Sequence, residues 1–247
     1  MSGRGWALVT AAGRRIGRSL ALAAAEAGYD VIAHVRAAGQ AEETCALVER
    51  LGRRSREVAF DLADAAALKA LPEGGGEPVT LLVNCASLFE DDRIGSLSAE
   101  GLDAHYAVNV RAPVLLAQAF AAALPGGRDG LIVNVIDQKV WRLTPQFFSY
   151  TVSKAALWAA TQTLAQAMAP RIRVNAIGPG PTLPSVHQAP GEFEAEASAT
   201  PLGHGPAPEE IGAALRYLID APSVTGQMIA VDGGQHLAWR TPDVLGD

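Results

Sequence analysis

The stretch Trp6-Ala-Leu-Val-Thr-Ala-Ala-Gly-Arg-Arg-Ile-Gly17 decides how the fold begins. Its apolar start predicts a buried strand at 6–10, and a helical pattern follows at 15–27. Gly13 and Gly17 permit a tight turn and close approach of the backbone to a ligand. The free N–H groups at the start of the helix can bind a diphosphate. The stretch therefore predicts a strand–turn–helix unit with a nucleotide site, although an ordinary strand–helix turn is the alternative.

Seven short apolar runs alternate with longer helical patterns along the chain. The runs predict strands at 6–10, 30–34, 56–60, 79–84, 130–135, 171–176 and 227–231. The helical patterns fill 15–27, 40–52, 64–71, 99–123, 149–168 and 208–219. Strands that are apolar throughout are typical of a parallel sheet covered by helices on both faces. The alternation predicts a doubly wound α/β fold of the Rossmann type, with a seven-stranded parallel sheet in a single domain over 1–247.

One long irregular segment interrupts this alternation at 178–207, and it is rich in proline. Loops of this length inside a compact domain are uncommon, and many of them are lids over an active site. We therefore expect a substrate lid at about 178–207. Plain surface padding is the alternative.

Composition excludes several classes of function. The net charge of −6 argues against nucleic acids and anionic membranes as partners, because binding phosphates requires a basic surface. The apolar stretches are shorter than the roughly 18 residues that suggest a membrane span. Two cysteines fit a reducing compartment, so we expect a soluble cytoplasmic protein. The five histidines show no metal-ligand spacing, and we expect no metal site.

Tyr150 and Lys154 form the most informative pair of polar residues. They are four residues apart in a helical pattern, so their side chains share one face. A fixed ammonium favours the phenolate and should lower the pKa of the Tyr150 hydroxyl. The pair could then donate a proton near neutral pH. Taken alone, the spacing would also fit a simple surface pair.

These motifs together resemble the short-chain dehydrogenase/reductase family. The stretch Thr10–Gly17 resembles the family's Thr-Gly-x-x-x-Gly-x-Gly turn, but Ala11 and Arg15 replace the first two glycines, and Gly13 could supply the flexibility that Ala11 lacks. Asn84-Cys-Ala-Ser87 is similar to the family's Asn-Asn-Ala-Gly segment. Further similar segments are Asp61-Leu62, Asn109-Val-Arg-Ala-Pro113, Ile177-Gly-Pro-Gly180 and Val231-Asp-Gly-Gly234.

The resemblance implies a cofactor, an assembly and roles for individual residues. The cofactor-binding residues that it implies are Thr10, Gly13, Arg14, Arg15, Ile16, Gly17, His34, Arg36, Asp61, Leu62, Asn84, Ala86, Ser87, Tyr150, Lys154, Pro179 and Gly180. Tyr150 would supply a proton, Lys154 would hold the ribose, and Asn109 would anchor a water that replaces the proton. A homotetramer is also implied.

The second strand favours NADP(H) over NAD(H). It ends Ala33-His-Val-Arg36, without an acidic residue that would accept the ribose hydroxyls and repel a 2′-phosphate. Arg14 and Arg36 are placed to meet that phosphate instead. We therefore expect NADP(H) as the cofactor.

Three features point to one branch of the family, the pteridine and dihydromonapterin reductases. Asp137 stands thirteen residues before Tyr150, where most members have a catalytic serine. Arg14-Arg15-Ile-Gly17 resembles the branch's basic phosphate turn. Ser87 and Phe89 match a serine that touches the cofactor and a phenylalanine that stacks on the pterin. Ser87, Phe89, Asp137 and Tyr150 are thus the expected substrate-binding residues.

The role of Asp137 and the substrate stay open at this point. Asp137 could be protonated in the working complex, or it could bind and protonate a ring nitrogen of the substrate. A dihydropterin or dihydrofolate substrate is the first interpretation. A reductase of other carbonyl compounds, such as 3-oxoacyl groups or ketones, is the second, and a non-catalytic dinucleotide sensor is the third. The branch also brings an arginine from a partner's C-terminus into the site, and Arg240 lies near that position.

Overall fold

A computed structural model describes residues 4–72 and 74–239 of the chain. Seven strands form one parallel sheet in the order β3-β2-β1-β4-β5-β6-β7. The strands are β1 Trp6–Val9, β2 Asp30–Val35, β3 Ser55–Ala59, β4 Val79–Asn84, β5 Gly130–Val135, β6 Ile172–Pro179 and β7 Met228–Val231. The predicted doubly wound α/β fold and its seven-stranded parallel sheet are confirmed.

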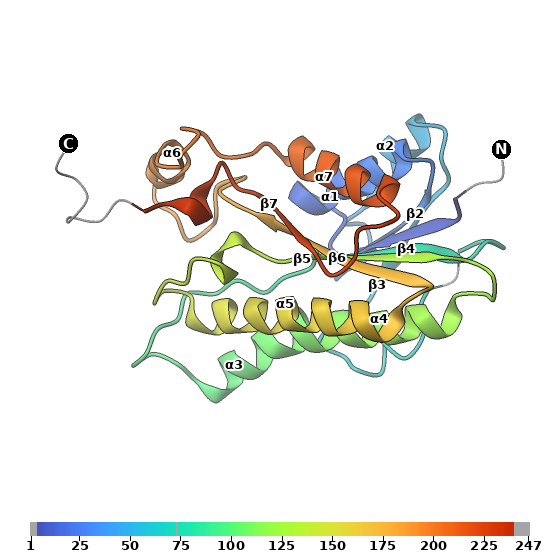
Figure 1. Ribbon diagram of the computed structural model, residues 1–247, viewed down its shortest axis with the longest axis horizontal. Helices are drawn as coiled ribbons and strands as arrows, with labels where there is room; N and C mark the ends of the chain where they lie inside the picture. The colour runs from blue at the N-terminus through green and yellow to red at the C-terminus, as the bar shows by residue number, and fades with distance from the viewer. Residues whose placement is uncertain (1–3, 73, 240–247) are drawn as a thin grey trace.

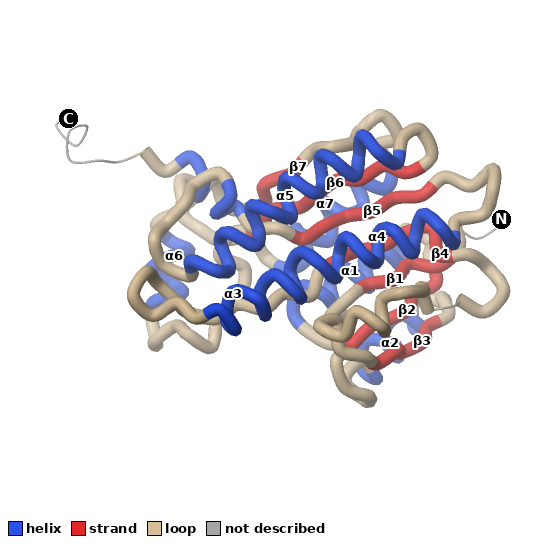
Figure 2. The backbone as a smooth tube through the Cα atoms, turned by 90° about the horizontal axis from the view of Figure 1, so that it is seen from below, coloured by secondary structure: helices blue, strands red, loops and turns tan. Residues whose placement is uncertain are grey.

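Helices cover both faces of the sheet. In Figure 1, α1 (Arg15–Glu26), α2 (Glu42–Arg50) and α7 (Pro208–Asp220) lie on one face. On the other face lie α3 (Ala99–Tyr106), α4 (Ala112–Ala123) and α5 (Phe148–Met168). Figure 2 shows α3 and α4 following each other end to end, with α5 running alongside them. None of the helices in the described part of the chain is long and apolar enough to cross a membrane.

The hydrophobic core has two main layers, one on each side of the sheet. Leu20, Val48 and Leu215 belong to the layer beneath α1, α2 and α7. Leu82, Leu116 and Phe120 belong to the layer beneath α4. β1, β2, β4 and β5 are buried along their whole length, as their continuous apolar runs predicted. The sheet is therefore rigid where it ends beneath the site.

The topology creates a switch point at the carboxyl ends of the strands. β1 pairs with β2 on one side and with β4 on the other, so the strand order reverses there. Ligands of doubly wound sheets bind at such a switch point. The turn after β1 and the segment after β4 meet at this point, and the expected nucleotide turn is one of the two.

The secondary structure differs from the prediction in three places. No helix forms at 64–71, where the side chains of Asp61 and Asp64 accept hydrogen bonds from Ala63 N and Ala66 N and favour turns. The predicted helix at 99–123 is α3 and α4 joined by a π-helical turn, Ala107–Arg111. The irregular segment 178–207 contains a short helix, α6 (Glu192–Ser198). Short 3₁₀ turns at Gln138–Val140 and Gln235–Leu237 complete the elements.

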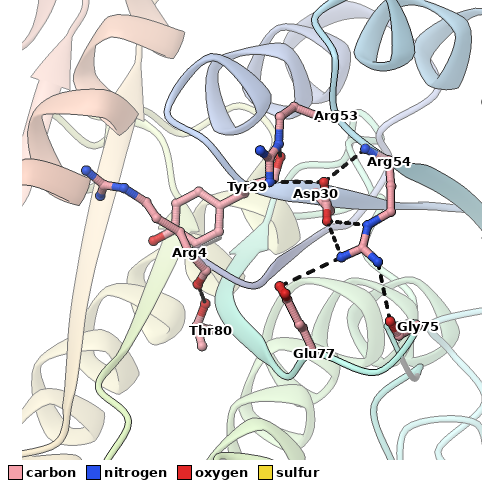
Figure 3. Close-up of polar contacts among 8 residues, drawn as sticks. All are labelled: Arg4, Tyr29, Asp30, Arg53, Arg54, Gly75, Glu77 and Thr80. Atoms are coloured by element: carbon pink, nitrogen blue, oxygen red, sulfur yellow. Dashed lines mark hydrogen bonds and ion pairs between the residues drawn. The ribbon is translucent and has the colours of Figure 1, made fainter. Parts of the chain in front are cut away.

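The opposite edge of the sheet is held together by Asp30, which is 3 % exposed. Its carboxylate accepts hydrogen bonds from Arg54 N at 2.9 Å and Arg54 Nε at 2.7 Å, and it pairs with Arg53 at 3.1 Å. Figure 3 shows both guanidinium groups converging on this carboxylate, with Arg54 also reaching Glu77 and the Gly75 carbonyl. Asp30 therefore joins the start of β2 to the start of β3.

We expect Asp30→Ala to lower the free energy of unfolding by about 2–3 kcal/mol, because both arginines lose a buried partner. Urea denaturation measures the change. Asp220→Ala is the matched control, since it removes an exposed ion pair with Arg4 and should cost less than about 1 kcal/mol. Equal losses in the two variants would show that Asp30 does not fasten this edge.

Candidate functional site

Tyr150 and Asp137 meet at the carboxyl end of β5. Asp137 follows that strand by two residues, and Tyr150 lies in the first turn of α5. The Tyr150 hydroxyl donates a hydrogen bond to Asp137 Oδ2 at 2.7 Å. Lys139 N donates to Asp137 Oδ1 at 2.8 Å and fixes the carboxyl group. The structure thus brings together two of the expected catalytic residues.

Lys154 lies one turn further along α5 and is fully buried, with 2 % exposure. Its ammonium donates to the Val135 carbonyl at 2.8 Å and lies 5.6 Å from the centre of the Tyr150 ring. Burial lowers the pKa of Lys154 to about 8, although the Asp137 charge opposes this shift. A buried ammonium with one protein acceptor retains donors for a ligand.

The pKa of Tyr150 moves in the direction opposite to our expectation. Burial raises it well above 10, and the Asp137 carboxyl adds to the shift through its charge and its hydrogen bond. The expected lowering by Lys154 does not prevail, since the phenol bonds to the carboxyl group rather than to the ammonium. Burial also raises the pKa of Asp137, against the hydrogen bonds from Lys139 N and Tyr150. Tyr150 is therefore a neutral donor held by a carboxyl group that accepts a proton more readily than usual.

The side chain of Asn109 is bonded entirely to protein groups, and the water expected at this residue stays a prediction. Asn109 is completely buried in the π-helical turn. Its Nδ2 donates to Leu88 O and to Ser153 Oγ, both at 2.9 Å. Its Oδ1 accepts from Leu88 N at 2.7 Å and from Ser87 Oγ at 3.3 Å. All four hydrogen-bonding positions of the amide are occupied by protein groups, so Asn109 holds the segment after β4 in place.

An aromatic wall stands beside Tyr150. The ring of Phe89 meets Tyr150 edge to face, with 4.7 Å between ring centres. Phe147 stacks on Phe89 at 4.3 Å with an angle of 9° between the planes. His187, from the irregular segment 178–207, packs against both phenylalanines and contacts the Phe89 carbonyl at 2.9 Å. Phe89 was predicted for this place, whereas Phe147 and His187 were not.

Phe147 could have been suspected, because it lies three residues before Tyr150. It precedes α5 in a left-handed conformation with φ of 53°, which is unusual for a bulky residue. Asp92, three residues after Phe89, caps the start of α5: its carboxylate accepts a hydrogen bond from Ser149 N at 2.9 Å, and its carbonyl accepts one from Phe148 N. His187 has no local sequence signal, because its contacts join residues about a hundred positions apart.

In the turn after β1, two residues other than glycine adopt the left-handed backbone conformation that glycine adopts most readily. Ala11 has φ of 55° and Arg15 has φ of 54°, both in the left-handed region that favours glycine. We expected Gly13 to supply the flexibility that Ala11 lacks, but Ala11 itself takes the left-handed conformation and Gly13 does not. Instead it allows close approach of the Gln40 carbonyl, with which a Cβ would collide. A Cβ on Gly17 would likewise overlap the Ala11 carbonyl, so both glycines are required by packing.

The N-terminus of α1 is open to an anion. No side chain caps it, and its first turn contains no acidic residue. Arg14 and Arg36 are exposed, and neither side chain has a hydrogen bond or ion pair with the described residues. Arg15 donates instead to the Leu183 carbonyl at 3.2 Å. The start of α1 thus offers N–H groups to an anion, and Arg14 in the same turn and Arg36 after β2 add two exposed guanidinium groups.

The His34 side chain contacts the backbone of the turn after β1, and its expected role in the cofactor site stays a prediction. His34 is buried, with 2 % exposure. Nε2 donates to the Phe60 carbonyl at 3.0 Å, so Nδ1 is free to accept from Ala11 N at 3.4 Å. Burial lowers its pKa, which favours this neutral form. His34 therefore supports the strained Ala11.

The other predicted cofactor residues line or support the same edge. Thr10 Oγ1 accepts from Cys85 N at 2.9 Å and Ala86 N at 3.0 Å, which fastens β1 to the end of β4. Asn84 donates to Asn134 at 2.8 Å, and its Oδ1 has no partner within the described residues. Ile16 and Leu62 pack against the core, whereas Asp61 and Ser87 are exposed. Pro179 is the last residue of β6, and Gly180 follows it. Arg240 lies outside the described residues.

The chain is similar to known oxidoreductases over nearly its whole length. A family model described as enoyl-(acyl carrier protein) reductase matches residues 10–236. FolM alternative dihydrofolate reductase 1 from Brucella canis, complexed with NADP, is 48 % identical with a TM-score of 0.93, covering 99 % of this chain and 98 % of that one. The corresponding protein from Brucella suis, also in complex with NADP, has the same identity and TM-score and covers 99 % and 100 %. L-xylulose reductase from Bos taurus is 35 % identical and covers 92 % of this chain and 95 % of its own.

The strain in the turn leads to a prediction. Ala11→Gly should raise the free energy of unfolding by about 0.5–1 kcal/mol, because glycine adopts the left-handed region without a steric penalty. Ala37→Gly is the matched control: this alanine is also exposed and has no positive φ, so the extra freedom of glycine in the unfolded chain should destabilise it. Urea denaturation compares the two. A loss of stability in Ala11→Gly would contradict the strain.

Proposed function

This chain belongs to the short-chain dehydrogenase/reductase family, and on that premise we propose that it uses NADPH to reduce a C=N or C=O bond of a dihydropterin or dihydrofolate. Membership follows from the family model and from relatives that match nearly the whole chain. The family makes it an NAD(P)-dependent oxidoreductase. The observation that carries the finer proposal is the 2.7 Å hydrogen bond between Tyr150 and Asp137 beside the ring of Phe89.

The described residues fit a bound NADP(H). The uncapped N-terminus of α1 offers N–H groups to the diphosphate, and Gly13 and Gly17 keep the turn compact. The Lys154 ammonium has one acceptor among the described residues, the Val135 carbonyl, and can donate to ribose hydroxyls. The unpaired guanidinium groups of Arg14 and Arg36 favour a 2′-phosphate, and β2 carries no acidic residue after Asp30 to repel it. The NADP complexes of the Brucella proteins support the same cofactor.

When bound, NADPH supplies the hydride for the reduction. The chain's own residues then manage the proton. Asp137, whose pKa is raised by burial, can take up a proton and donate it to the Tyr150 oxygen that it contacts. The neutral Tyr150 hydroxyl is then free to donate its own proton to the substrate atom that gains negative charge, and the Asp137 proton replaces it. Lys154 fixes the carboxyl end of β5 through the Val135 carbonyl and keeps a positive charge beside the pair.

A pterin suits this arrangement better than a simple ketone. Its flat ring can lie against an aromatic wall, and its ring nitrogens can bond to a carboxyl group. A ketone needs only one donor at its oxygen, and a serine at position 137 would supply one without a buried charge. Asp137 therefore favours the pterin over the general carbonyl substrate, which the resemblance to L-xylulose reductase keeps as the second candidate.

Two further features belong to this proposal. The segment 178–207 contacts the cofactor turn through Arg15 and Leu183, and it contacts the aromatic wall through His187 and Phe89. A segment that contacts both halves of the site is suited to act as a lid. We also expect a homotetramer, which rests on the family resemblance. A non-catalytic sensor would have no use for the buried Tyr150–Asp137 pair.

The decisive assay measures oxidation of NADPH by the wild-type protein with dihydrobiopterin, dihydromonapterin, dihydrofolate and an aliphatic ketone. We expect turnover of at least one dihydropterin or of dihydrofolate, with a higher kcat/KM than for the ketone. Asp137→Ser should lower kcat/KM for that substrate by about 10²-fold or more, because it removes the carboxyl group that holds and relays the proton. Reduction of the ketone should be unchanged or improved.

The controls separate a local from a general effect. Asp137→Asn keeps an acceptor for the Tyr150 hydroxyl but cannot carry a proton, so it should lose activity as Asp137→Ser does. Asp129→Ser changes an exposed residue at the opposite end of β5 and should match the wild type. Efficient ketone reduction without turnover of any dihydropterin or dihydrofolate would overturn the pterin proposal in favour of a general carbonyl reductase.

A further inference from the structure

The backbone around Phe89 is held by side chains and not by a neighbouring strand. Asn109 bonds both the N–H and the C=O of Leu88, at 2.7 and 2.9 Å. His187 contacts the carbonyl of Phe89 at 2.9 Å. His105 Nε2 lies 3.3 Å from Glu90 N and accepts its hydrogen bond. Four backbone polar groups of the segment Leu88–Glu90 thus have side-chain partners.

His105 has the tautomer that this contact requires. Its Nδ1 lies 2.8 Å from the Gly101 carbonyl, which can only accept, so Nδ1 carries the hydrogen. Nε2 is then an acceptor, and the Glu90 N–H is the donor that it meets. The imidazole is 2 % exposed, so water does not compete for either nitrogen. Both nitrogens are satisfied inside the protein.

His105 and Asn109 act from one helical region on the two sides of Phe89. They are four residues apart, at the end of α3 and in the π-helical turn that follows it. Asn109 fixes the residue before Phe89, and His105 fixes the residue after it. The ring itself is held by Phe147 on one face. The position of the Phe89 ring is therefore set by this helix as well as by its aromatic neighbours.

We propose that His105 is a positioning residue that holds Phe89 in place for stacking on the substrate ring. This inference rests on the proposed function, since it assumes that the substrate is a flat heterocycle. Stacking contributes most when the ring is held before binding, because fixing a loop during binding costs conformational entropy. Without His105 the loop gains freedom at Glu90, and part of the binding free energy is spent on ordering it again.

The position of His105 defines what its loss should change. Within the described residues its hydrogen bonds join it to Glu90 and Gly101 and not to Tyr150, Asp137 or Lys154, so the proton donor stays intact. Its helix, α3, lies on the opposite face of the sheet from α1 (Figure 1). A purely structural histidine would change stability without affecting one substrate more than another. A positioning residue for Phe89 should change KM for the flat substrate and leave kcat and cofactor affinity nearly unchanged.

The test compares His105→Phe, which cannot accept from Glu90 N, with His105→Gln, whose amide oxygen can. We expect His105→Phe to raise KM for the best dihydropterin by about 3- to 10-fold, the effect of one lost hydrogen bond. KM for an aliphatic ketone, kcat and the Kd for NADPH should change less than about twofold. His105→Gln should restore most of the loss. Asp103→Asn, an exposed change on the same helix, should match the wild type.

Hydrogen exchange of the Glu90 amide tests the contact without any substrate. Exchange should be about 2- to 10-fold faster in His105→Phe and close to wild type in His105→Gln. Unchanged exchange in His105→Phe would overturn the contact. Faster exchange with equal KM changes for pterin and ketone would overturn the positioning role. If the wild type reduces no dihydropterin, the proposed function and the stacking role both fall, whereas the exchange result still decides whether His105 holds Glu90.

Discussion

The hydrogen bond from the Tyr150 hydroxyl to the Asp137 carboxyl links the end of β5 to the first turn of α5, and the rest of the site depends on it. Both side chains are withdrawn from bulk water, and burial raises the pKa of each. The Asp137 carboxyl raises the pKa of Tyr150 further, whereas the Tyr150 hydroxyl favours the charged form of Asp137. The parallel sheet makes this possible, because it places the end of β5 and the start of α5 at the same edge. The neighbouring elements then hold the pair: Lys139 N fixes the carboxyl group, and Lys154 is anchored to Val135.

A second constraint is that the backbone of the site is set by packing more than by the local preference of its residues. Ala11, Arg15 and Phe147 adopt left-handed conformations that glycine would adopt more readily. Two of them are held by neighbouring groups. Ala11 N donates a hydrogen bond to His34, and Phe147 stacks on Phe89 next to the capped start of α5. Such conformations persist where the surroundings determine them, and they concentrate at functional sites. The backbone on either side of Phe89 is likewise held by its surroundings, because Asn109 bonds Leu88 and His105 bonds Glu90.

The sequence predicts the fold well because continuous apolar runs directly report burial on both faces of a parallel sheet. It also identifies Tyr150, Lys154, Asp137 and Phe89, whose spacing within one element or motif is local. It misses Phe147, His105 and His187, because their contacts join residues that are far apart in the chain or at the ends of helices. It also assigns the wrong direction to the pKa of Tyr150, since the balance between Lys154 and Asp137 depends on which atom the hydroxyl reaches. The spacing of Tyr150, Lys154 and Asp137 in the sequence does not determine which of the two charged groups the hydroxyl contacts.

The central claim is that Tyr150 works as a neutral donor held by Asp137, and not as a phenol acidified by Lys154. Ultraviolet absorbance of tyrosinate tests it most directly, as the difference between the wild type and Tyr150→Phe during a pH titration of the free protein. The account predicts no tyrosinate from Tyr150 below pH 10, because burial and the Asp137 carboxyl raise its pKa above that value. In Asp137→Ser the onset of ionisation should move to lower pH, since the opposing charge is gone. A Tyr150 signal that titrates near about pH 7 in the wild type would contradict the account and restore acidification by Lys154.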